Sequence, residues 1–148
     1  MTTPNNTTWR ALADQLTPEQ IAELEYCERE QIPPGLADPE HHLNCARAMA
    51  CENFIQRLCA DVAAPADAGG TINDWEEWGD GYGRMYTVSN RGAVEIFGVQ
   101  FDDGRIERNI LCRADCDMTA ADARRLAQAL IEAADELDRL DDTARTAI

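Results

Sequence analysis

The most specific chemistry in this sequence belongs to two histidines and six cysteines. Imidazole and thiolate groups are the ligands that zinc prefers in proteins. His41 and Cys45 are spaced by one helical turn, and Cys112 and Cys116 have the same spacing. These four residues could bind one zinc ion if the helix that carries His41 crosses the chain near Cys112. No Cys-x-x-Cys pair is present, so the favoured interpretation is free thiols that fill the core.

Covalent catalysis has few candidates. The chain has no lysine, and Ser89 is its only serine and lies outside a Gly-x-Ser-x-Gly motif. These absences exclude a Walker phosphate loop, a Schiff base and the serine hydrolase elbow. A nucleophilic Cys45 with His41 or His42 as its base is the remaining option, and the sequence shows no orienting group or oxyanion hole for it. We therefore expect a protein that is not an enzyme.

The net charge narrows the partners. The chain has 28 acidic and 13 basic residues and a net charge of -15. Such a negative potential repels nucleic acid and anionic lipid and attracts basic surfaces. We expect a basic protein partner, no direct nucleic acid binding and no membrane binding. The chain begins without a basic or apolar leader, which predicts a cytoplasmic protein with reduced cysteines.

Residues 73–86 combine aromatic rings, acidic side chains and glycines. Aromatic anchors surrounded by charge are typical of the energetic centre of a protein interface. The alternative is that the tryptophans close one end of the core while the glycines form turns. The candidate partner-binding residues are Trp75, Glu76, Glu77, Trp78, Asp80 and Tyr82.

Two helices are predicted in the N-terminal part. Thr17 to Gln20 form a capping box that begins a helix extending to about residue 30. A second helix begins near Asp38, and the pair is expected to form an antiparallel hairpin. One stripe of the second helix should face the core; it contains Leu43, Arg47, Ala50, Cys51, Phe54, Leu58 and Val62. Residues 63–70 are predicted to be a linker, because small residues, one proline and paired glycines favour neither packing nor a helix.

The hydrophobic period changes to that of strands after Arg84. Residues 85–89, 94–101 and 105–112 predict a three-stranded antiparallel β-meander. A two-residue turn at Asp103-Gly104 would pair Phe101 with Ile106, Val99 with Arg108, and Phe97 with Ile110 on one apolar face. Arg108 would then either extend its guanidinium to water, which we expect, or pair with a buried acid.

A last helix over about 119–140 should cover the sheet. Its predicted apolar stripe contains Ala123, Leu126, Ala127, Leu130, Ala134 and Leu137. The fold class is therefore α+β, with an N-terminal helical hairpin, a three-stranded antiparallel β-meander and a C-terminal helix packed on the sheet. We expect residues 1–66 and 67–148 to form two parts that share one core.

Two stretches carry a resemblance. The segment GVQFDDGRIERNI with the following MTAADARRLAQALIEAADEL, and the earlier LTPEQIAELE, resemble parts of small acidic proteins of actinobacteria and their phages. Those proteins have no assigned activity. The resemblance implies a phage or prophage protein that interacts with host proteins.

The leading hypothesis is a non-enzymatic acidic interaction protein that binds a basic host protein, with DNA mimicry as a special case. One alternative is a zinc-stabilised or thiol-active protein that uses His41, Cys45, Cys112 and Cys116. A second alternative is a homo-oligomeric structural or assembly protein, in which the second helix supplies a dimer seam through Cys45 and Cys59.

Overall fold

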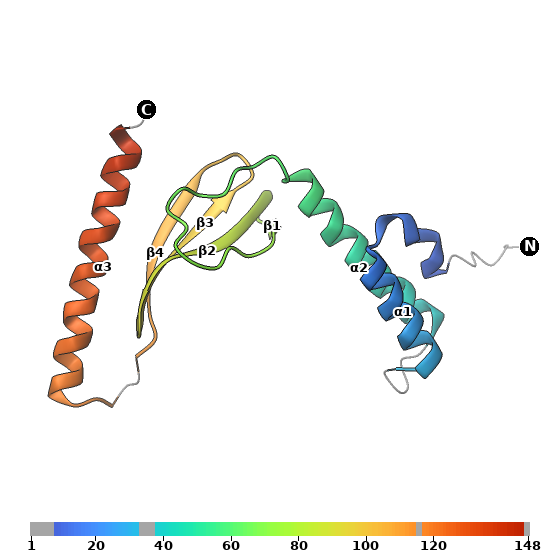
Figure 1. The fold of residues 1–148 in the computed structure, drawn as a ribbon, viewed down its shortest axis with the longest axis horizontal. Coiled ribbons are helices and arrows are strands. Elements are labelled where there is room, and N and C mark those ends of the chain that lie inside the picture. The colour runs from blue at the N-terminus through green and yellow to red at the C-terminus, as the bar shows by residue number, and fades with distance from the viewer. Residues whose placement is uncertain (1–7, 33–37, 115–116, 147–148) are drawn as a thin grey trace, which may run out of the picture. The chain divides into compact units, whose positions relative to one another are not determined.

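The computed structural model describes residues 8–32, 38–114 and 117–146 and confirms the α+β class. Contacts divide the chain into a first unit, Met1–Ala60, and a second unit, Asp61–Ile148. The sequence suggested a boundary after residue 66, whereas residues 61–66 belong to the second unit. Figure 1 shows the helices of the first unit, and the sheet and long helix of the second. No described helix is long and apolar enough to cross a membrane.

The first unit is a small helical assembly. The predicted capping box is present, because the Thr17 hydroxyl accepts from the Gln20 amide at 3.3 Å and the Gln20 side chain accepts from the Thr17 amide at 2.9 Å. Asp38 caps the next helix in the same way, accepting from the His41 amide at 2.6 Å. The elements of the first unit are the 3₁₀ helix η1 (Trp9–Gln15), α1 (Pro18–Glu30) and α2 (Pro39–Leu58).

Trp9, Leu24 and Ala46 form the buried core of this unit, with one residue from each element. Asn53 ties the elements together, because its amide donates to the Gln15 carbonyl at 2.9 Å and to the Gln20 side chain at 2.7 Å. An exposed ion pair, Arg10 to Glu28 at 2.7 Å, joins η1 to α1.

The stripe predicted on α2 is only half right. Leu43 and Ala50 are buried, but Phe54 and Leu58 are 52% and 55% exposed, and α2 ends at Leu58. His42, Ala46 and Ile55, which the prediction left out, are buried in place of the exposed residues, because the first unit is small and its core needs only one narrow line of contact along α2.

The second unit contains a four-stranded antiparallel sheet with the order β1-β2-β3-β4. The meander was predicted, and the structure adds a short strand at its edge, β1. A bulge at Val88 shifts the pairing of β2 with β3 between Thr87 and Ser89. The strands are β1 (Glu76–Trp78), β2 (Gly81–Arg91), β3 (Val94–Phe101) and β4 (Ile106–Cys112).

The predicted register of the β3–β4 hairpin is wrong by one residue. Phe101 pairs with Arg105, as shown by its amide donating to the Arg105 carbonyl at 2.8 Å, so the loop has three residues. Gly104 has φ +87, and a glycine with positive φ at this place is typical of the three-residue hairpin loop. A shift of one residue moves every side chain of β4 to the opposite face relative to β3.

The predicted linker, residues 63–70, forms no helix, as expected, but the expectation that it does not pack is wrong, because it contacts the sheet. The amides of Gly69 and Gly70 both donate to the Thr87 carbonyl, at 3.0 and 3.2 Å. A Cβ at Gly69 would lie 2.2 Å from the Val88 carbonyl oxygen, so only glycine permits this approach. Ala68 and Ile72 pack against the main core.

The C-terminal helix α3 (Ala120–Thr146) packs on one face of the sheet, as predicted. Leu126, Leu130 and Leu137 contact the core of Tyr86, Val88, Val94, Ile96 and Ala133. The alanines of the predicted stripe, Ala123, Ala127 and Ala134, are exposed, and Ala129 and Ala133 face the sheet in their place. Small residues at these two positions allow a close approach of helix and sheet.

We expect Gly98→Ala to lower the free energy of unfolding by about 1–3 kcal/mol. A Cβ on Gly98 would lie 2.3 Å from the Tyr86 ring, which is 2% exposed and cannot move outward. Urea unfolding measures the change. In a Tyr86→Ala background the same substitution should cost much less, and an equal cost in both backgrounds would contradict the contact.

Candidate protein-binding surface

The register of the sheet divides its side chains between two faces. Tyr86, Gly98 and Arg108 share the face on which α3 packs. We call the opposite face the second face. It carries Glu76, Trp78, Met85, Thr87, Glu95, Phe97, Val99, Phe101, Glu107, Asn109 and Leu111.

Trp75, a predicted partner-binding residue, is buried with 5% exposure. The Arg84 guanidinium lies 4.5 Å above its ring and also donates to Gln100 at 2.9 Å. Gln100 in turn donates to the Ala63 carbonyl at 2.8 Å. Trp75 is therefore part of the interior of the second unit, as in the alternative that the tryptophans close one end of the core.

Trp78 differs from Trp75, because it is 37% exposed and lies on the second face. Its ring stands edge-to-face with Phe101, with the centroids 6.5 Å apart. Gly83 lies under the ring, and a Cβ there would be 3.2 Å from Trp78. The sequence placed Trp78 in a loop, whereas a strand pairing holds it.

The other predicted partner-binding residues surround Trp78. Glu76 and Glu77 are exposed on β1, Asp80 is exposed in the turn that follows, and Tyr82 is half-buried on β2. Glu77 pairs with Tyr82 in the register, so these two share the α3 face, while Glu76 shares the second face with Trp78. The six residues thus divide between an interior and two opposite faces.

The second face has an apolar centre and a charged periphery. Met85, Phe97 and Leu111 are half-buried, while Val99 and Phe101 are only 5% and 8% exposed. The carboxylates of Glu76 and Glu107 are exposed around them, and the Arg105 guanidinium lies 4.0 Å above the Phe101 ring. The helix of this unit packs on the opposite face, so the apolar side chains here have no helix of the second unit over them.

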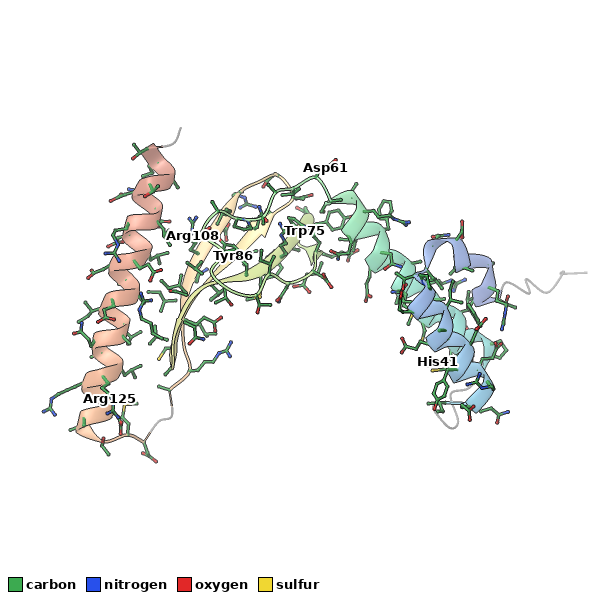
Figure 2. All side chains as sticks on the ribbon, viewed as in Figure 1. His41, Asp61, Trp75, Tyr86, Arg108 and Arg125 are labelled. Atoms are coloured by element: carbon green, nitrogen blue, oxygen red, sulfur yellow. The ribbon has the colours of Figure 1, made fainter. Side chains whose placement is uncertain are left out.

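A buried ion pair fixes which face α3 covers. Arg108 donates to Asp67 at 2.7 Å, and the two side chains are only 11% and 12% exposed. Arg108 also contacts Asp141 of α3 at 3.4 Å, and the Tyr86 hydroxyl donates to Asp67 at 3.1 Å. Figure 2 labels Arg108 and Tyr86 on the side of the sheet that faces α3.

The expectation that Arg108 reaches water is wrong. The three-residue loop places it opposite Gly98, on the covered face, where a charge needs a partner. Asp67 supplies that partner from the segment that the sequence indicated as a linker. The ion pair therefore joins residues 61–73, the sheet and α3.

The predicted zinc ligands are only partly described. His41 and Cys45 meet on α2, with Cys45 Sγ 3.6 Å from His41 Nε2. Cys112 is exposed at the end of β4 in the second unit, and Cys116 lies outside the described residues. The described residues hold no group of three or more metal-binding side chains. Zinc binding by these four residues stays a prediction.

The predicted dimer seam on α2 used Cys45 and Cys59. Cys45 is half-buried, and Cys59 is buried with 2% exposure, so Cys59 presents no surface to a partner helix. The exposed side chains of α2 in this region are Cys51, Phe54 and Leu58.

A cavity of about 480 Å³ lies beside the start of α3 and the end of β4. Arg91, Arg113 and Arg125 line it together with Met118 and Leu126. Each arginine already has an acidic partner: Glu136, Glu95 and Asp122, respectively. These pairings neutralise much of the positive charge that an anionic ligand would need.

Comparisons with protein-family models, curated proteins and solved structures find no match to this chain. The candidate surface therefore depends on its own geometry. Sequence reasoning missed Met85, Phe97 and Leu111 as surface residues, because the two-residue turn placed Phe97 against Ile110. A three-residue turn ending at Gly104 was the signal that could have found them.

We expect Arg108→Met to lower the free energy of unfolding by about 2–4 kcal/mol, because it leaves Asp67 buried without its cation. Arg105→Met is the matched control, since the Arg105 and Glu107 side chains are 58% and 55% exposed, and it should cost less than about 1 kcal/mol. Urea unfolding of both variants makes the comparison. Equal costs would show that the ion pair does not hold the layers together.

Burial, reinforced by the Asp67 carboxylate, raises the pKa of Tyr86 from 10.0 to about 12. The folded protein holds this proton more tightly than the unfolded chain, so the stabilisation is complete below pH 10 and is lost as the pH rises through 12. From pH 10 to pH 12 the free energy of unfolding should therefore fall by about 2–3 kcal/mol more in the wild type than in Tyr86→Phe. Urea unfolding at stepped pH tests this, and parallel curves would contradict it.

Proposed function

We propose that this chain is a non-enzymatic interaction protein that binds a basic partner protein through the second face of its sheet. The observation that carries the proposal is the exposed Trp78 against the Phe101 ring, on a face that also carries the half-buried Phe97 and Met85 and on which α3 does not pack. Apolar side chains inside a polar border are the arrangement that protein interfaces use.

The chemistry of the partner follows from charge. Glu76 and Glu107 lie on this face, Glu107 already pairs with Arg105 at 2.9 Å, and the whole chain has a net charge of -15. A partner segment with arginine or lysine beside apolar side chains would contact both the centre and the border. Complementary charge also speeds association, by steering the two surfaces together.

Protein contact is favoured over DNA mimicry. Mimicry needs carboxylates in a continuous row, whereas Trp78, Phe97 and Phe101 separate Glu76, Glu95 and Glu107 on the second face. A DNA channel offers few apolar contacts for such rings. A phage or prophage origin and a host target, as the resemblance implies, are compatible with this proposal and are not needed for it.

A defined peptide pair tests the proposal. One peptide alternates arginine and leucine, and the second replaces each arginine by glutamate. Calorimetric titration should give at least about tenfold tighter binding of the arginine peptide, because like charges repel the glutamate peptide. Equal affinity for both peptides would overturn the proposed partner chemistry.

Trp78→Ala should weaken binding of the arginine peptide about ten- to one-hundredfold, because aromatic anchors supply much of the energy of an interface. Ile131→Ala is the matched control, since Ile131 is an exposed apolar side chain on α3, with 57% exposure. The Ile131→Ala variant should bind the arginine peptide with the affinity of the wild type. If Trp78→Ala binds as the wild type does, the second face is not the binding surface.

A further inference from the structure

The two edges of the sheet are protected to different degrees. At one edge β1 has only three residues, and the segment before it is held irregularly through Gly69 and Gly70. At the other edge β4 has seven residues without proline, glycine or a bulge. Natural proteins shorten, kink or cover exposed edges, because a regular edge pairs with further strands. The β4 edge is neither shortened nor kinked.

The hydrogen-bond pattern shows which groups this edge offers. The Phe101 amide donates to Arg105 and the Arg113 amide donates to Ala93, so odd-numbered residues of β4 make the bonds to β3. In an antiparallel pair the alternate residues point their amides and carbonyls the other way. The outward groups therefore belong to Ile106, Arg108, Ile110 and Cys112. In the part of the chain that the structure describes, β3 is the only strand that pairs with β4.

We infer that β4 pairs antiparallel with β4 of a second copy of this chain. In a symmetric pair the residue at the centre of β4 lies opposite the same residue of the other copy. The choice of this central residue defines the register, and the registers can be compared by the side chains that they place opposite each other. A centre at Arg108 places two arginines opposite each other, and a centre at Asn109 places Arg105 opposite Arg113. Like charges directly opposite destabilise a strand pair, which disfavours both registers.

The register centred on Ile110 has no such conflict. It places Ile110 opposite its own copy and Arg108 opposite Cys112. It also places Glu107 of each copy opposite Arg113 of the other. Both side chains are accessible, at 55% and 70% exposure, and each would exchange its ion-pair partner within the chain, Arg105 or Glu95, for the partner across the edge. They occupy a non-hydrogen-bonded pair, in which opposite side chains approach most closely. The result is one continuous sheet with two equivalent ion pairs.

This self-association shares Glu107 with the proposed binding face, but the two proposals have different tests. The bonds at the edge come from backbone groups of β4 and are tested by Cys112→Pro, whereas the peptide is expected to bind at Trp78 and is tested by Trp78→Ala. The net charge of -15 per chain opposes dimer formation at long range. At 0.15 M salt the charges are screened beyond about 8 Å, so the contacts at the edge decide the outcome.

Sedimentation equilibrium at 0.15 M salt tests the inference. The wild type should reach twice the 16.4 kDa mass of the chain at high concentration. Glu107→Arg and Arg113→Glu should each raise the dimer dissociation constant at least about tenfold, because each sets like charges opposite each other. The double variant restores both ion pairs and should return to within about threefold of the wild type.

Two further variants complete the experiment. Cys112→Pro removes an amide that points outward, so it should abolish the dimer and keep the circular dichroism of the folded chain. Arg145→Glu, on the last turn of α3, changes a 79% exposed charge outside the β4 register and should leave the dissociation constant unchanged. A wild type that stays monomeric overturns the inference. A dimer unaffected by the charge exchanges and by Cys112→Pro overturns it as well.

Discussion

The second unit depends on one buried contact, the ion pair between Arg108 and Asp67. A cation on the covered face of a sheet is costly unless a carboxylate accompanies it. Asp67 comes from the segment before the sheet, and Asp141 of α3 approaches the same guanidinium. The Tyr86 hydroxyl also donates to Asp67. One charge thereby fixes three parts of the chain that hydrophobic packing alone would hold less specifically.

This constraint determines what remains for function. Because α3 and the segment around Asp67 share one face with Arg108, the apolar side chains of the other face lack a helical cover from the second unit. Trp75 is stacked under Arg84 and joins the interior, while Trp78 stays accessible three residues later. The same sheet therefore has one face for stability and one that we propose for binding.

The sequence predicted the helices, the meander and the position of α3, because capping residues and hydrophobic periods are local signals. The prediction from the sequence failed at the β3–β4 hairpin, because one residue more or less in the loop changes the register of the strands. Taking Asp103-Gly104 as a two-residue turn placed Phe97 and Ile110 on one face, and the structure separates them. The linker failed for a related reason, since Gly69 serves a close approach to Val88 that only the folded sheet creates.

The positions of the candidate surface residues could be predicted only in part. Composition alone cannot tell that Arg84 would cover Trp75, because their contact depends on the register of β2. The charge is easier to interpret: an acidic chain that leaves Trp78 exposed has a surface on which attraction and apolar contact act together. An apolar face without nearby charge would favour aggregation, and charge without rings would give little affinity. Trp78 and Glu76 lie on one face of β1, and in the proposed function they would supply apolar contact and charge together.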